Sequence, residues 1–130
     1  MNAFEKRISL EDIKPGVVVW PVFSVTGSVA VVMNPVEFTS GPYRCDTIGA
    51  WRFQFNKDGY GCSNYANDNN VKLPNNRQYN FHALFLNKED AEEYAEMINN
   101  NELPDDLRAL RDQFVAEMQK ERENDPGDFW

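Results

Sequence analysis

One short stretch, residues 79–91, divides this chain into a β part and an α part. Its first half, residues 79–86, has the apolar and aromatic content of a buried strand. Asn87 follows, and its side chain can accept a hydrogen bond from the free N–H groups of a first helical turn. The sequence therefore predicts a strand, then a helix that begins directly after Asn87 and is capped by it.

Apolar side chains recur at helical spacing after that boundary. A stripe at positions i, i+3, i+4 and i+7 predicts a helix over residues 88–99. Asparagines at 99–101 end it, because asparagine tolerates the left-handed conformation. Pro104 suits the first turn of a second helix. The first stripe consists of Ala91, Tyr94, Ala95 and Ile98, and the second helix carries Leu107, Leu110, Phe114 and Met118.

Short apolar runs separated by turn residues fill residues 8–86 and are typical of an antiparallel sheet. Trp51, Phe53 and Phe55 alternate with polar residues, so they share one face. Residues 39–42 form a predicted turn, and Pro21 predicts a sheet edge or a bulge because it lacks an N–H. The predicted fold is α+β: a bent antiparallel sheet, of which an SH3-like small barrel is one form, followed by two C-terminal α-helices.

The length of 130 residues is that of one domain with a real core. We predict a single globular domain over residues 1–122, with its β part at 8–86 and its helical part at 88–122. Residues 123–130 are predicted to form a disordered acidic tail. No run of roughly 18–20 apolar residues and no secretory signal is present, which predicts a cytoplasmic protein.

The net charge of −8 is unevenly distributed. Residues 1–86 hold seven acidic and eight basic side chains (net +1), whereas residues 87–130 hold fourteen acidic and five basic ones (net −9). Phosphate contacts require Lys and Arg, so this charge argues against direct binding to nucleic acid or to an anionic membrane.

The acidic helices have two interpretations. A solvated helix face is the ordinary one, and a surface that mimics nucleic acid and binds another protein is the sharper one. The predicted partner-binding residues are Glu89, Glu92, Glu93, Glu96, Asp105, Asp106 and Asp112.

The long segment 56–78 offers an alternative function, a small-ligand or nucleotide-binding module that uses this loop and the aromatic residues of the sheet. Its candidate ligand-binding residues are Asp58, Tyr60 and Tyr65. The segment begins like a calcium-binding loop, but Asn67 replaces the closing glutamate, so a hairpin turn at Gly59 is the favoured interpretation.

Catalytic and metal-binding signatures are weak. His82 is the single histidine, and with Cys45 and Cys62 it lacks a recognisable metal spacing, so we predict free thiols, no metal and no cofactor. An enzyme built on His82, Cys62 and Asp58 remains the third hypothesis, behind a structural role for His82. Self-association is left open.

Several motifs resemble small accessory proteins of tailed bacteriophages, over roughly residues 8–98. They are residues 8–16 (ISLEDIKPG), Val19-Trp20, Ser40-Gly41-Pro42-Tyr43, Asp46-Thr47-Ile48-Gly49, and Tyr79-Asn80-Phe81-His82 with Phe85 and residues 91–94. Such proteins often read Asn-x-His-x-x-Phe-x-Thr before a short helix, and Asn87 stands here where Thr is more usual. The resemblance implies a phage-encoded protein that works in the bacterial cytoplasm, and it implies no particular activity. We therefore predict a non-enzymatic protein that binds and modulates a host protein, in host takeover or anti-defence.

Overall fold

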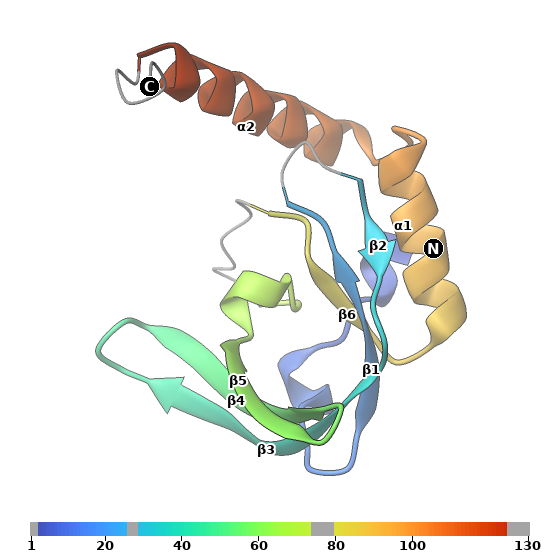
Figure 1. The fold of residues 1–130 in the computed structure, drawn as a ribbon, viewed down its shortest axis with the longest axis vertical. Helices are drawn as coiled ribbons and strands as arrows, with labels where there is room; N and C mark the ends of the chain where they lie inside the picture. The colour runs from blue at the N-terminus through green and yellow to red at the C-terminus, as the bar shows by residue number, and fades with distance from the viewer. Residues whose placement is uncertain (1–2, 26–28, 74–79, 125–130) are drawn as a thin grey trace.

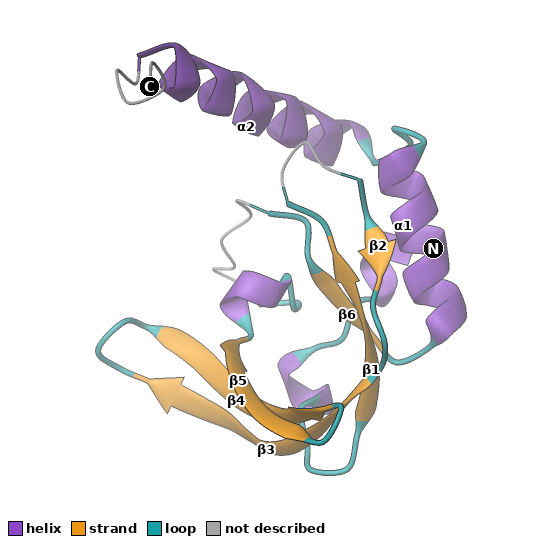
Figure 2. Cartoon of the chain, viewed as in Figure 1, coloured by secondary structure: helices purple, strands orange, loops and turns teal. Residues whose placement is uncertain are grey.

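The computed structural model describes residues 3–25, 29–73 and 80–124. A curled sheet comes first in the chain and two α-helices follow it (Figures 1 and 2). The strands are β1 (Val18–Phe23), β2 (Val31–Val32), β3 (Val36–Cys45), β4 (Ala50–Lys57), β5 (Tyr60–Tyr65) and β6 (Ala83–Phe85). The helices are α1 (Lys88–Asn99) and α2 (Asp105–Asn124), with short 3₁₀ turns η1 (Ala3–Lys6), η2 (Leu10–Asp12) and η3 (Asn67–Asn69).

Strand β1 is the centre of the sheet. The strand order is β2-β1-β3-β4-β5, all antiparallel, and β6 pairs with the other edge of β1. Along one edge, β1 pairs first with β3 at Val19↔Val36 and then with β2 at Val22↔Val32. The sheet curls into a half-barrel (Figure 2), which confirms the predicted α+β fold with a bent antiparallel sheet and two C-terminal helices.

Pro21 lies inside this sheet, so of the two predicted alternatives the sheet edge was wrong. The bulge is what the ladder shows, because between Val19↔Val36 and Val22↔Val32 two residues of β1 (20–21) lie opposite three (33–35). It pairs with Leu84 of β6 on one side, and on the other its carbonyl accepts a hydrogen bond from the Met33 N–H at 2.8 Å. The chain leaves the ladder between β2 and β3, at residues 33–35. Pro21 has no N–H to donate, and this is tolerated because no continuous strand lies opposite it on that side.

The predicted turn at residues 39–42 was also wrong, because these residues lie within β3. The register to β4 shifts between Phe38 and Ser40 and again between Ser40 and Tyr43, so turn-forming residues bend a strand here. Gly41 has φ +120°, and a Cβ at this position would lie 3.0 Å from the Cα of Phe53. Glycine is therefore required both by backbone conformation and by close approach of β4.

Two hydrophobic clusters hold the fold together, and β6 contributes to both. Ala83 and Phe85 belong to the cluster beneath α1, whereas Leu84 belongs to the cluster inside the curl of the sheet. The predicted stripe of α1 is buried throughout, and Phe53 is buried between the half-buried Trp51 and Phe55. Both patterns were therefore predicted correctly.

Helix α1 has the predicted bounds, but its cap differs. The Asn87 side chain makes no capping bond, and its Nδ2 instead donates to the Asp90 carboxylate at 3.2 Å. The helix ends at Asn99 as expected, and Asn101, two residues later, has the left-handed φ of 56°. Asn99 pairs its amide with the peptide groups of Ala30, at 2.8 and 3.1 Å, and so attaches this helix end to the residue before β2.

Helix α2 extends away from the sheet at one end of the molecule (Figure 1). Leu107 is buried and Leu110 is half-buried, while the side chains of Phe114 and Met118 lie outside the described ones. The helix reaches Asn124, two residues into the predicted tail, and residues 125–130 lie outside the description. The predicted domain limits stay a prediction.

Replacing Gly41 tests the bend in β3. We expect Gly41→Ala to lower the free energy of unfolding by about 2–3 kcal/mol, because strain at positive φ adds to a clash with Phe53. Gly59→Ala is the matched control, since Gly59 also has positive φ (+87°) but a Cβ added there would meet nothing within 4 Å. That control should lose only about 1 kcal/mol in urea unfolding. Equal losses in the two variants would contradict the close approach.

Candidate functional site

Four glutamates form a row along the outer side of α1. Glu89, Glu92, Glu93 and Glu96 follow the spacing i, i+3, i+4 and i+7, and all four are exposed. The opposite side of the helix is the buried stripe that packs on the sheet. We call this row the acidic face of α1. The acidic face of α1 must point away from the sheet, because the helix has only one apolar side to bury.

Two lysines partly neutralise the acidic face. Lys6 of η1 lies 3.3 Å from Asp90 and 3.7 Å from Glu93, and Lys88 lies 3.8 Å from Glu92. The hydrogen bond with Asp90 raises the pKa of Lys6. Ion pairs this exposed contribute little and are screened by salt, so the face stays negative. Within the described residues, Glu89 and Glu96 form no ion pair.

The three predicted acids of α2 form a separate group. Asp105, Asp106 and Asp112 are exposed, and Asp105 pairs with Arg108 one turn later. Because α2 leaves the end of α1 in another direction (Figure 1), the structure does not extend the acidic face of α1 into them. The seven predicted residues therefore belong to two surfaces.

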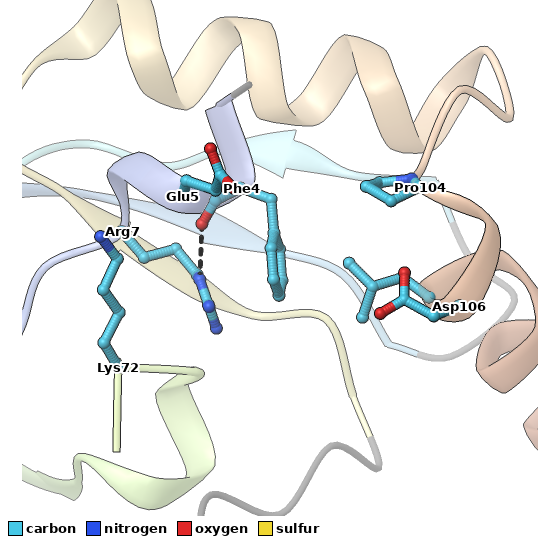
Figure 3. Close-up of a pocket in the computed structure, with 7 residues that line it drawn as sticks. Phe4, Glu5, Arg7, Lys72, Pro104 and Asp106 are labelled. Carbon is cyan, nitrogen blue, oxygen red and sulfur yellow. Dashed lines mark hydrogen bonds between the residues drawn. The ribbon is translucent and has the colours of Figure 1, made fainter. Parts of the chain in front are cut away.

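A cavity of about 480 Å³ lies where η1 meets the start of α2 (Figure 3). Its charges are balanced, with two basic and two acidic side chains. Arg7 stacks on the Phe4 ring, with its guanidinium carbon 3.6 Å from the ring centroid, and its Nε donates to the Phe4 carbonyl at 2.7 Å. The lining residues are Phe4, Glu5, Arg7, Lys72, Pro104, Asp106 and Leu107.

Arg7 continues from this cavity into a buried polar network. Its Nη1 donates to both the backbone carbonyl and the side-chain oxygen of Asn70. Asn70 is 1% exposed, and its side chain acts on the buried hydroxyl of Tyr94, which donates to the Phe81 carbonyl at 3.0 Å. Burial raises the pKa of Tyr94 and lowers that of Arg7. We call Arg7, Asn70 and Tyr94 the Asn70 network, and its contacts are those of a structural support.

Sequence reasoning missed Arg7 and Asn70. Asn70 is one of several asparagines between residues 64 and 70, and the polarity of this segment is typical of a surface loop. Its left-handed conformation, with φ 51° and ψ 43°, is one that asparagine favours. Several neighbouring residues are asparagines too, so the residue type alone does not point to Asn70. Only its contacts distinguish Asn70 from them.

The predicted ligand-binding residues Asp58, Tyr60 and Tyr65 do not come together. Asp58 and Gly59 form the two-residue turn of the β4–β5 hairpin, both with positive φ, which confirms the hairpin interpretation. Tyr60 is 75% exposed and begins β5 directly after that turn, whereas Tyr65 lies at the opposite end of β5.

A second cavity, of about 230 Å³, lies in the curl of the sheet and is lined by His82. The Ser24 N–H donates to Nδ1 of His82 at 2.8 Å, and the ring stacks on Phe23 with centroids 4.4 Å apart. Burial lowers the pKa of His82, against an opposing effect of Asp68. Cys62 and Asp58, the other two residues of the enzyme hypothesis, do not line this cavity. Cys45 and Cys62 are free thiols, as predicted.

Comparison with protein families places the chain. A family model described as Phage g100-like protein matches residues 7–98, more than two-thirds of the sequence. The chain belongs to the Phage g100-like protein family. This confirms the resemblance to phage accessory proteins. Neither the curated proteins nor the solved structures contain a match to the chain.

The region shared with the Phage g100-like family includes most of the features described above. It begins at Arg7 and ends at Ile98, so it contains the Asn70 network, the cavity beside His82 and the acidic face of α1. Helix α2 lies beyond it. No helix in the described part of the chain is long and apolar enough to cross a membrane. In the same part, no group of three or more His, Cys, Asp or Glu side chains could hold a metal ion.

The Asn70 network can be tested by substitution. We expect Asn70→Ala to lower the free energy of unfolding by about 3 kcal/mol, because the part-buried guanidinium of Arg7 loses its side-chain partner, a cavity forms beside Tyr94 and alanine is strained at positive φ. Asn70→Gly removes the same bonds without that strain, so it should be about 1 kcal/mol less damaging. Urea denaturation measures both, and a loss below about 1 kcal/mol for the alanine variant would refute the structural role.

His82 should make stability depend on pH. Since its pKa in the folded protein is lowered from about 6.5, the unfolded chain binds the proton more readily. The contribution of neutral His82 is therefore complete above about pH 6.5 and is lost as the pH falls below that value. His82→Asn keeps an acceptor for the Ser24 N–H without titrating, so its advantage over wild type should grow as the pH falls. Parallel stability curves for the two proteins would contradict this assignment.

Proposed function

We propose that this phage-family protein is non-enzymatic and binds and modulates a host protein in the host cytoplasm through the acidic face of α1. The observation that carries the proposal is the row of four exposed glutamates on a helix whose other side is completely buried. A rigid row of like charges favours a partner with a basic surface, since electrostatic complementarity determines orientation and association rate.

The spacing of these charges supports mimicry of nucleic acid. Seven residues separate Glu89 from Glu96, so the row rises by about 10 Å along the helix axis. Four carboxylates over that length give roughly one negative charge per 3 Å, close to the phosphate spacing of about 3.4 Å along one DNA strand. The natural partner on this basis is a host protein with a basic nucleic-acid-binding site.

Affinity capture from bacterial host lysate tests this function. The variant Glu89→Gln, Glu92→Gln, Glu93→Gln and Glu96→Gln should lose a partner that the wild-type protein retains. The control variant changes four exposed acids of the sheet half, Glu11→Gln, Glu37→Gln, Asp46→Asn and Asp58→Asn, and should retain it. Each set removes four negative charges, from −8 to −4, so net charge alone is matched between them.

Two further measurements separate mimicry from ordinary contact. Raising the salt concentration from roughly 0.15 M to 1 M shortens the Debye length from about 8 to about 3 Å, so the complex should dissociate. Duplex DNA added in excess should displace the protein from its partner. If no specific partner is captured, or if the α1 variant and the control bind equally well, this function is wrong. A parallel variant at Asp105, Asp106 and Asp112 tests the separate surface of α2.

A further inference from the structure

The cavity in the curl of the sheet is independent of the acidic face of α1. It opens on the concave side of the sheet, and its volume is about 230 Å³. Its walls come from β1, residues 33–34, β3, β4, β5, η3, His82 and β6, which are far apart in the sequence. A drug-sized ligand needs about 300–1,000 Å³, so this space encloses one planar ring system, and the other groups of a larger ligand would lie outside it.

Aromatic side chains form much of the cavity wall. Phe53 is 2% exposed and is held edge-to-face against Phe38, with ring centroids 5.1 Å apart, and Phe55 lies against it. Phe23 instead remains 50% exposed, although it is stacked on His82 at an interplanar angle of 22°. The half-exposed flat ring of Phe23, which lines the cavity together with Phe53 and Phe55, offers a stacking surface for a planar ligand.

The hydrogen-bonding groups left over on the lining residues are mostly donors. Nδ1 of His82 accepts from Ser24, so the neutral ring carries its proton on Nε2. Oδ1 of Asn64 accepts from the Tyr65 N–H, which leaves its NH₂ group. Asn69 uses its NH₂ on the Tyr65 carbonyl, which leaves one oxygen as an acceptor. Carbonyl and ring-nitrogen acceptors on a ligand would match this set.

One positive charge completes the site. Lys57 lines the cavity and forms no ion pair with any described residue. None of the described lining residues is acidic, and the carboxylate that acts on the pKa of His82 is that of Asp68 in η3. The cavity is therefore positive in a protein whose net charge is −8, which favours a ligand with a negative group.

We propose that this cavity binds a free mononucleotide, with its base stacked against Phe23 and its phosphate beside Lys57. A single-stranded polynucleotide fits less well, because successive phosphates need a basic groove and only one lysine is available here. This proposal does not depend on the contact through α1, and each can fail without the other.

Titration by two-dimensional NMR tests the site without any substitution. The four ribonucleoside 5′-monophosphates should be added to the labelled full chain, and at least one should shift the amide signals of Phe23, Asn64 and His82 in a saturable way. Absence of such shifts up to millimolar concentration for all four would overturn the proposal. Shifts confined to residues outside the cavity would overturn it as well.

Two variants then identify the contacts. Phe23→Ala should weaken binding about tenfold, because base stacking on an aromatic ring is lost. Tyr43→Ala is the matched control, since Tyr43 is similarly exposed (46%) but lies on β3 outside the cavity, and it should bind as wild type does. Lys57→Gln should weaken the monophosphate and leave the corresponding nucleoside unchanged. Binding that survives Phe23→Ala would reject the site, and tighter binding of a short single-stranded RNA than of the monophosphate would reject a free nucleotide as its ligand.

Discussion

The contacts of the buried Asn70 are the constraint on which the rest of the structure depends. Arg7, the residue after η1, donates to the carbonyl and side-chain oxygens of Asn70, and Asn70 also acts on the buried hydroxyl of Tyr94 in α1. The buried apolar stripe of α1 determines which side of the helix faces the sheet, and the hydrogen bond from the Tyr94 hydroxyl to the Phe81 carbonyl adds a requirement for its position along the sheet. The stripe and this buried polar contact together fix where α1 lies, and with it the direction of the acidic face.

Strand β6 separates two environments on either side of the sheet. Because strand side chains alternate, Ala83 and Phe85 pack beneath α1 while Leu84 lines the cavity in the curl. Tyr94 reinforces this division, since its hydroxyl bonds the carbonyl of Phe81 just before the strand. One short strand thus supports both a charged outer surface and a concave aromatic one.

Local patterns predicted much of the fold, and long-range contacts limited the rest. The stripe of α1, the alternation around Phe53 and the turn at Gly59 each depend on neighbours in sequence, so periodicity identified them. Arg7 and Asn70 lie 63 residues apart, and Ser24 and His82 lie 58 apart, so no local pattern indicates either pair. The exposed glutamates of α1 followed from helical spacing alone. The cavity did not, because it needs the curl of the whole sheet and the bend at Gly41 that helps to form it.

An acidic helix and a cavity for an anionic ligand can coexist because the fold keeps them apart. A helix with its side chains is about 10–12 Å across, and the acidic face lies on the side of α1 away from the sheet. The carboxylates of this face are thus separated from the strands that line the cavity by about the width of a helix, roughly 10 Å. The Debye length is about 8 Å at physiological salt, so their repulsion of a phosphate beside Lys57 is largely screened. The charge on α1 therefore leaves the cavity free to select its ligand by stacking, hydrogen bonding and one local lysine.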